Sequence, residues 1–357
     1  MSIGTEDGSR IEVNDRPLIS FCLFAYNQER FIREAVGGAF SQTYSPLEII
    51  LSDDCSTDRT FEIIKEMAAI YHGLHRIVLN RNPKNLGNGG HVNRVMEMAQ
   101  GVLVVAAAGD DISSSQRTQA LYDEWLKQNK RPTLIHSDYK IINEKGLLVE
   151  ENKPRCSFSG CRSAGINDIK EFVKGEHPAS GIIGATQAWG CQIFRKVGPL
   201  KKDVFFEDKI ICFRSLIAGE FAYVPQKLIC YRMHSNNLIA RYYNDSSRIV
   251  RIRKYLLQEL TNNLRWLAVI NNLKADVIDF TNQGVLSKSY GNAALREIDH
   301  CMMVKKCEWK VCSTSPFIGL MWLGCRLILR PELGYARHAV KNWAFRSADC
   351  MGLLPKQ

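Results

Sequence analysis

Short apolar runs rich in Val and Ile alternate with amphipathic stretches from residue 18 to about residue 143. Such runs predict buried strands, and stretches with apolar residues three or four positions apart predict helices. Predicted strands lie at 18–26, 47–54, 76–82, 102–111 and 133–143, and predicted helices at 31–42, 59–71, 91–100 and 115–128. This alternation favours an α/β fold with a mainly parallel central sheet flanked by helices, which is a nucleotide-binding architecture.

The pattern changes after the predicted sheet. Residues 144–187 mix polar residues and glycines into the apolar positions, and we interpret them as loops that border the site. A helix is predicted at 206–219 and a strand at 221–234, and from residue 245 the apolar stripe is helical. We therefore expect three regions, which are a polar extension (1–16), a catalytic domain (17–239) and a basic helical C-terminal region (240–357).

The charge of the chain is concentrated in its last third. Residues 1–239 contain 29 Lys and Arg against 28 Asp and Glu, whereas residues 240–357 contain 18 against 9, so that most of the net charge of +10 lies in the tail. A basic tail suits an anionic membrane surface, an anionic acceptor or nucleic acid, and charge alone does not choose among them.

One segment of the tail, 317–329, is strongly apolar. It has only 13 residues and contains Arg326, whereas a membrane span needs about 20 residues. It suits a helix that lies on a membrane surface, and a buried helix of the tail is the alternative.

The beginning of the chain and its cysteines favour a cytoplasmic location. The first residues are polar and lack the basic and apolar segments of a signal peptide. The 12 cysteines include no C-x-x-C pair, so buried reduced thiols are favoured over disulfides or metal ligands. We expect a cytoplasmic protein that can bind peripherally to the inner face of the cell membrane.

Polar loops follow the predicted strands at the edge where α/β proteins bind ligands. In AGDD (108–111), two adjacent carboxylates repel each other unless a cation lies beside them, and carboxylate oxygens suit Mg²⁺ or Mn²⁺. An Asp pair after a strand also suits a turn or a helix cap. Asp54, in SDDCSTD, follows a predicted strand and is placed to accept a hydrogen bond from a nucleobase N–H.

Several ordered motifs resemble one enzyme family. LISFCLFAYNQERFIREAV, LEIILSDDCSTDRT, NPKNLGNGGHVNR and AGDD, followed by FFEDKIICFRSLIAG and ICYRMHSNN, resemble family 2 inverting glycosyltransferases, which have the GT-A fold. The resemblance covers about residues 17–239 and implies transfer of a sugar from a nucleoside-diphosphate sugar. Because the motifs occur in the family's order, together they are more specific than any one of them.

The resemblance implies the donor-binding residues. Tyr26 would pack beside the nucleobase, Asp54 would hydrogen-bond the base, and Asn27 and Glu29 would shape the loop. Arg94 is a candidate contact of the diphosphate.

It also implies a divalent cation, Mn²⁺ or Mg²⁺. Asp111 would ligate the metal, Asp110 would hold the ribose or a metal-bound water, and His234 would supply a further ligand. Ala108 stands where many relatives have the first acid of Asp-x-Asp.

On the acceptor side, the resemblance makes Asp208 the general base. The alternative for Asp208 and Glu207 is capping of the predicted helix, because the helix dipole favours acids in a first turn. Trp189 is a weak candidate for stacking on a sugar, and core packing is its alternative.

The leading hypothesis is a transferase that adds a sugar, most simply from a UDP-sugar, to a glycan or lipid-linked acceptor in surface-polysaccharide assembly. A degenerate domain that only binds glycans or nucleotides is the alternative, and a nucleotidyltransferase is disfavoured because no Gly-rich basic loop follows the first strand. Nucleic acid is the least favoured partner, and the sequence leaves the oligomeric state open.

Overall fold

The computed structural model describes residues 16–150, 164–201, 204–234 and 248–314. The chain forms two compact units, one of Met1–Tyr243 with Ala268–Asp299 and one of Asn244–Leu267 with His300–Gln357. The first unit thus includes a helical segment from the C-terminal region together with the predicted catalytic domain.

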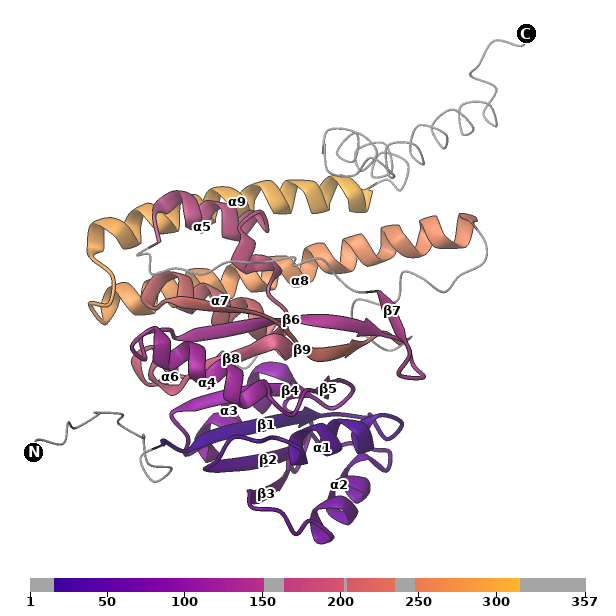
Figure 1. Cartoon of the computed structure of the whole chain (residues 1–357). Helices are drawn as coiled ribbons and strands as arrows, with labels where there is room; N and C mark the ends of the chain where they lie inside the picture. The colour runs from indigo at the N-terminus through magenta and orange to yellow at the C-terminus, as the bar shows by residue number, and fades with distance from the viewer. Residues whose placement is uncertain (1–15, 151–163, 202–203, 235–247, 315–357) are drawn as a thin grey trace, which may run out of the picture. The chain divides into compact units, whose positions relative to one another are not determined.

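A central sheet organises the first unit (Figure 1). Its strand order is β3-β2-β1-β4-β8-β6-β9-β5, and β7 pairs with β6. The strands are β1 Ile19–Ala25, β2 Leu47–Asp53, β3 Arg76–Arg81, β4 Leu103–Ala108, β5 Ile112–Ser113, β6 Leu134–Ile142, β7 Leu148–Glu150, β8 Gln187–Gly190 and β9 Phe221–Arg232.

Two parallel groups of strands meet at an antiparallel strand. Strands β3, β2, β1 and β4 are parallel to their neighbours, as are β6 and β9, while β8 runs antiparallel between β4 and β6. The carboxyl ends of β1, β2 and β4 therefore lie at one edge, and the loops that follow them gather there.

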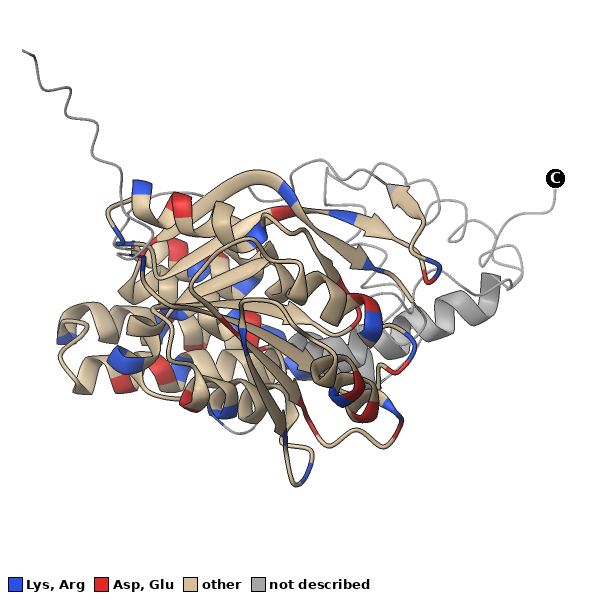
Figure 2. Cartoon of the chain, turned by 60° about the horizontal axis from the view of Figure 1, so that its bottom comes forward, with Lys and Arg blue, Asp and Glu red and all other residues tan. Residues whose placement is uncertain are grey.

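The described helices are α1 Ile32–Phe40, α2 Thr60–Ala69, α3 Gly87–Met98, α4 Arg117–Lys127, α5 Ile166–Lys174, α6 Cys191–Val197, α7 Glu207–Ala218, α8 Arg248–Asn282 and α9 Lys288–Thr314, with 3₁₀ turns η2 Pro178–Gly181 and η3 Gly184–Thr186. Alternate residues of β1, such as Phe21 and Leu23, pack against α1, α2 and α4 in one core. In Figure 2 the strands are largely free of charged residues, which colour mainly helices and loops. The expected α/β fold with a helical C-terminal region is confirmed.

Helix α7 is buried almost throughout, from Ile210 to Ile217. Its one buried charge, Arg214, donates from Nε and Nη2 to the two carboxylate oxygens of Asp276 on α8, at 2.9 Å each. Both side chains are 2% exposed, and Arg214 also donates to the carbonyl of Gly198 at 2.8 Å. This ion pair ties the C-terminal helices to the sheet-covering helix.

Three local expectations differ from the structure. Helix α3 begins at Gly87 rather than at residue 91, because the carboxylate of Asp54 accepts the backbone N–H groups of Leu86 and Gly87 at 2.9 and 3.0 Å. Residues 144–187 are not only loops, since they contain β7 and α5, whose start is fixed by Asp168 accepting the Gly165 N–H at 2.7 Å. Strand β8 was not predicted, because its four residues are too few to show a period of two.

None of the described helices is long and apolar enough to cross a membrane. The apolar segment 317–329 lies outside the described residues. Those cysteines whose side chains are described are free thiols, as expected.

The buried ion pair makes a prediction about stability. Asp276→Ala leaves the guanidinium of Arg214 buried without its carboxylate, and we expect a loss of about 3–5 kcal/mol in the free energy of unfolding. Asp279→Ala is the matched control, because Asp279 on the same helix forms an exposed ion pair with Lys201 and should cost at most about 1 kcal/mol. Chemical denaturation measures both. Equal losses for the two variants would contradict this account.

Candidate active site

The loop after β1 is fastened to the loop after β2. Asn27, at a positive φ of 52°, accepts the backbone N–H of Thr57 on its side-chain oxygen at 2.8 Å, and its own N–H donates to Ser56 Oγ at 2.8 Å. The carboxylate of Glu29 accepts the N–H of Arg59 at 3.0 Å. Both side chains therefore fix the shape of the loop.

Tyr26 and Asp54 lie at adjacent strand ends but differ in exposure. Tyr26 is 45% exposed and Asp54 is 3% exposed. Besides the N–H groups of Leu86 and Gly87, the carboxylate of Asp54 accepts the Asn82 side-chain amide at 2.8 Å. The structure thus presents the Tyr26 ring to solvent and uses Asp54 to join the end of β2 to the start of α3.

The turn after β4 is held by Arg232 from the end of β9. Its backbone N–H donates to Asp111 Oδ1 at 2.8 Å, and its Nε donates to the Asp110 carbonyl at 2.9 Å. A terminal guanidinium nitrogen donates to Glu34 on α1 at 2.9 Å. Arg232 is fully buried, so its charge is used to join strand ends.

This bracing brings His234 to Asp110. The imidazole Nε2 lies 2.9 Å from Asp110 Oδ2, and the ring packs on Phe31 with centroids 4.7 Å apart. The side chains of His234 and Asp110 are 7% and 14% exposed. A carboxylate and an imidazole from distant parts of the chain thus meet at the sheet edge.

Asp111 is more deeply placed than Asp110. It is 5% exposed, and its Oδ2 is buried without a hydrogen-bond partner among the described residues. Burial and the neighbouring Asp110 raise the pKa of Asp111, while the Arg232 N–H opposes this shift. Beside the turn, Arg117 is fully buried, and burial lowers its pKa to about 9.

A cation site at this turn has a suitable but small set of protein ligands. Among the described residues, no group of three or more His, Cys, Asp or Glu side chains is arranged so that it could hold a metal ion without other ligands. The unpartnered oxygen of Asp111, the carboxylate of Asp110 and the imidazole of His234 are donors that divalent cations accept. Such a site fits a cation that takes its remaining ligands from substrate phosphates.

The first turn of α7 carries Glu207 and Asp208. Asp208 Oδ2 lies 3.2 Å from Lys209 Nζ, which also donates to the carbonyl of Ile182 at 2.9 Å. Opposite stands Gly184 of η3, where a Cβ would come within 3.1 Å of Asp208 Cβ. A glycine therefore leaves the space beside the candidate base open.

A cavity of 90 Å³ connects these elements. It is lined by Ala108 at the end of β4, Glu207 at the start of α7, and side chains of α3 and β8. Burial, and after it the proximity of Asp208, raises the pKa of Glu207 to about 7. Ala108, which begins the candidate metal turn, and Glu207, which precedes the candidate base, thus border one space.

Two other predicted residues lie in different surroundings. Arg94 is exposed on α3 and pairs with Glu97 at 3.1 Å, so it is not among the residues gathered at the site. Trp189 is 2% exposed, donates from Nε1 to Gln187 Oε1 at 2.7 Å, and lines the cavity from β8. It packs in the core and borders the site at the same time.

The structure adds two residues that the motifs did not single out. His91, one turn before Arg94, lines the cavity with its Nε2 2.7 Å from Ser52 Oγ, and burial lowers its pKa to about 4. Asn88 lines it too and donates to the Phe205 carbonyl at 2.8 Å. The one available signal was their position in the polar segment NLGNGGH, which follows a predicted strand.

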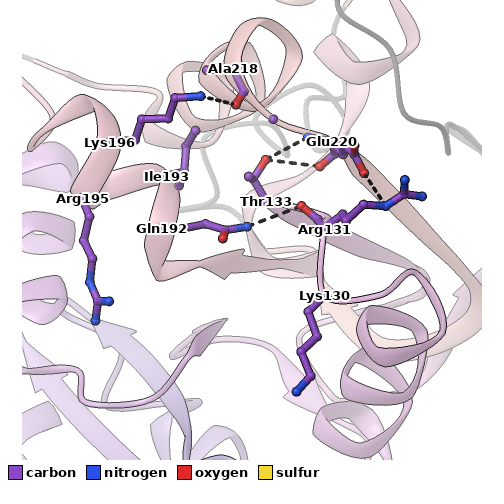
Figure 3. A pocket seen from close by; sticks show the side chains of 10 residues that line it. Lys130, Arg131, Thr133, Gln192, Ile193, Arg195, Lys196, Ala218 and Glu220 are labelled. Carbon is purple, nitrogen blue, oxygen red and sulfur yellow. Dashed lines mark hydrogen bonds and ion pairs between the residues drawn. The ribbon is translucent and has the colours of Figure 1, made fainter. Parts of the chain in front are cut away.

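A second, larger hollow of 710 Å³ lies near the amino ends of β6 and β9, away from this edge (Figure 3). Arg131 pairs there with Glu220 at 3.5 Å, and Lys196 donates to the Ala218 carbonyl at 3.3 Å. None of the predicted site residues lines it.

Comparisons with known proteins agree with these features. A family model described as glycosyl transferase family 2 matches residues 20–146. An uncharacterized glycosyltransferase of Haemophilus influenzae is 25% identical over 283 residues, which cover 77% of this chain and 85% of the relative. An uncharacterized protein of Mycobacterium tuberculosis is 27% identical over 230 residues, or 64% of this chain. The chain spans 62% of the length of that mycobacterial relative.

Two solved structures share the fold. TarS of S. aureus (residues 1–349), in complex with UDP-GlcNAc, has a TM-score of 0.55 at 14% identity, covering 94% of this chain and 92% of that one. A mannosyltransferase from Pyrobaculum calidifontis, in complex with GDP-Man and Mn²⁺, has a TM-score of 0.51 at 14% identity, with coverages of 97% and 89%. Residues 20–146 thus match glycosyl transferase family 2, relatives named as glycosyltransferases resemble a larger part of the chain, and the solved structures share its GT-A fold.

Proposed function

We propose that this protein transfers a sugar, with inversion, from a UDP-sugar to a hydroxyl of a glycan or lipid-linked saccharide. The observation that carries the proposal is the cavity lined by both Ala108 and Glu207, which sets the β4 turn and the first turn of α7 on neighbouring walls. Inverting transfer needs charge neutralisation on the leaving-group side and a base on the acceptor side, and these two walls offer one each. Sugar nucleotides in the structures with this fold support the donor class.

On the donor side, the exposed ring of Tyr26 offers a surface on which a nucleobase can stack. Asn27 and Glu29 hold the loop that carries Tyr26. Asp54 would hydrogen-bond the base, and its hydrogen bonds to the N–H groups of Leu86 and Gly87 and to the Asn82 side chain also fix the wall of the site. Arg94 has no role in this proposal because it lies on the exposed side of α3.

For the cation, the geometry favours Asp110 and His234 as direct ligands. Their polar atoms already lie within 2.9 Å, whereas Asp111 is 5% exposed and has only its Oδ2 unpartnered, since its Oδ1 accepts the Arg232 N–H. Asp111 would then hold the turn, which exchanges the roles that the resemblance gave to the two acids. The imidazole favours Mn²⁺ over Mg²⁺, because Mg²⁺ prefers oxygen ligands. A bound divalent cation would neutralise the charge that develops on the diphosphate as it leaves.

On the acceptor side, Asp208 would take the proton from the attacking hydroxyl. The hydroxyl oxygen forms a bond to the anomeric carbon, the bond from that carbon to the diphosphate oxygen breaks, and the proton moves to the carboxylate. The ammonium of Lys209, 3.2 Å away, holds the carboxylate in place. Attack from the side opposite the leaving group inverts the anomeric centre.

The role of Asp208 predicts a large effect on turnover. Asp208→Asn should lower kcat by roughly 10² to 10⁴, the usual contribution of a positioned proton acceptor, and should leave the affinity for UDP nearly unchanged. Steady-state kinetics and calorimetric titration with UDP measure the two effects.

The matched control is Asp168→Asn, which replaces an acid in the first turn of α5 that accepts the Gly165 N–H and lies 4.0 Å from His177 Nε2. It should lower stability by about 1 kcal/mol and leave kcat unchanged. A stably folded Asp208→Asn protein with full kcat would show that the base lies elsewhere.

The cation assignment predicts a loss of metal coupling. Mn²⁺ should strengthen UDP binding to the wild-type protein by a factor of about 10 to 100, within the usual range for coupled ligands, and Asp110→Asn should abolish most of that factor. Asp123→Asn, at an exposed position of α4, should keep the same strengthening of UDP binding by Mn²⁺ as the wild type. Loss of the factor in Asp111→Asn but not in Asp110→Asn would instead favour Asp111 as the ligand.

The raised pKa of Glu207 predicts a pH-dependent stability. Because its pKa is about 7 in the folded protein, against an ordinary value of 4.5, the neutral carboxyl stabilises the fold at low pH, and this contribution is lost as pH rises from about 4.5 through about 7. Glu207→Gln, which cannot ionise, should therefore show a smaller fall in Tm between about pH 5 and about pH 8. An identical fall in wild type and variant would contradict the shift.

A further inference from the structure

The cavity between β4 and α7 has mainly apolar walls. Side chains of Phe24, Val92, Ala106, Ala108, Ala185 and Trp189 line it. On the wall formed by β4 the lining residues are alanines, and larger side chains there would fill the cavity. At 90 Å³ it exceeds the roughly 10–15 Å³ that one water needs, so it can take a group of several heavy atoms.

Polar groups are confined to one side of the cavity. They are the amide of Asn88, the imidazole of His91 and the carboxyl of Glu207. His91 is held by Ser52 and stays neutral near pH 7, because burial lowers its pKa to about 4. This side of the cavity therefore offers hydrogen-bonding groups, and the other sides offer apolar contact.

Such walls discriminate among the substituents of a sugar. A hydroxyl against the apolar walls would lose its hydration without a hydrogen bond in return, which is unfavourable. A methyl group alone would make no hydrogen bond with the polar side of the cavity and so would gain nothing from it. An acetamido group has an amide for the polar side and a methyl for the apolar walls.

The place of the cavity indicates which sugar carbon bears the group. Glu207 lines it, and the neighbouring Asp208 is the proposed base for attack at the anomeric carbon. Gly184 also lines the cavity. A Cβ atom added to Gly184 would lie 3.5 Å from Glu207 Oε1 and 3.1 Å from Asp208 Cβ. The cavity thus adjoins the reacting centre, where the substituent of the next ring carbon would lie.

We propose that the donor is a UDP-sugar with an acetamido group at C2, and that this group occupies the cavity between β4, α3 and α7. The inference rests on the proposed function, since it assigns a subsite within the same donor site. Ala106 and Ala185 would contact the methyl, and Asn88 with Glu207 would contact the amide.

The direct test compares matched donors on the full chain. Calorimetry with Mn²⁺ would measure UDP, UDP-Glc, UDP-GlcNAc, UDP-Gal and UDP-GalNAc. At least one acetamido donor should bind about ten-fold more tightly than its hydroxyl counterpart, the lower end of what a hydrophobic pocket gains from a matching group. If UDP binds but each acetamido donor binds no more tightly than its hydroxyl counterpart, this inference is overturned and the proposed function is not. No binding of UDP would overturn the proposed UDP-sugar function and this inference with it.

A cavity-filling variant locates the effect. Ala185→Leu should reduce the affinity for the acetamido donor to that of the hydroxyl donor and leave UDP binding unchanged. Ala68→Leu is the matched control, because Ala68 is an equally half-buried alanine on α2 that does not line the cavity. Thermal melting verifies that both variants fold, and the wild-type comparison stands without them. A folded Ala185→Leu protein that keeps the full preference would overturn the assignment to this cavity.

Discussion

The candidate site depends on the buried guanidinium of Arg232. A charge that is removed from water must be matched by hydrogen bonds, and Arg232 finds them on the β4 turn and on Glu34 of α1. These bonds fix the end of β9 against the end of β4. As a result, His234, two residues further along, lies against Asp110. A pair of donor atoms that the sequence separates by more than one hundred residues thus becomes a local feature of the sheet edge.

A second buried charge, that of Arg214, fixes the position of α7, the wall of the site that carries Asp208. Arg214 in the middle of α7 pairs with Asp276 of α8, so the helix that carries Asp208 in its first turn is fastened to the C-terminal helices. Residues Ala268–Asp299 accordingly belong to the same compact unit as the family domain, although the family match ends at residue 146. The α7 wall, which we propose as the acceptor side, therefore lies outside the matched region.

Much of this arrangement could be predicted from the sequence, because the positions and ends of the strands follow from hydrophobic periodicity. The loops at Asn27, Asp54 and Asp110 all fall at the predicted edge. The choice of side chain within a helix was harder. Arg94 was singled out by its charge, yet in α3 it is His91, one turn earlier, that faces the cavity. Two residues that are three positions apart on α3 therefore differ in whether they face solvent or the site. The local sequence does not determine which residue faces the site, because the contact with Asp54 sets where the helix starts.

The other differences have the same origin in long-range contacts. Strand β8 exists because β4 and β6 flank it on both sides, and Trp189 is buried for that reason. The respective roles of Asp110 and Asp111 depend on which of them the Arg232 N–H reaches, which motif spacing does not reveal.

The central claim is that the two walls of this edge form a metal-assisted sugar-transfer site. The most direct measurement is the release of UDP from UDP-sugars by the full chain, without an acceptor, in the presence and absence of Mn²⁺. The account predicts slow release of UDP that requires Mn²⁺, because water can replace the acceptor hydroxyl in the same site. Tight, Mn²⁺-independent binding of UDP-sugars with no release under any condition would contradict it and would indicate a binding domain that has lost catalysis.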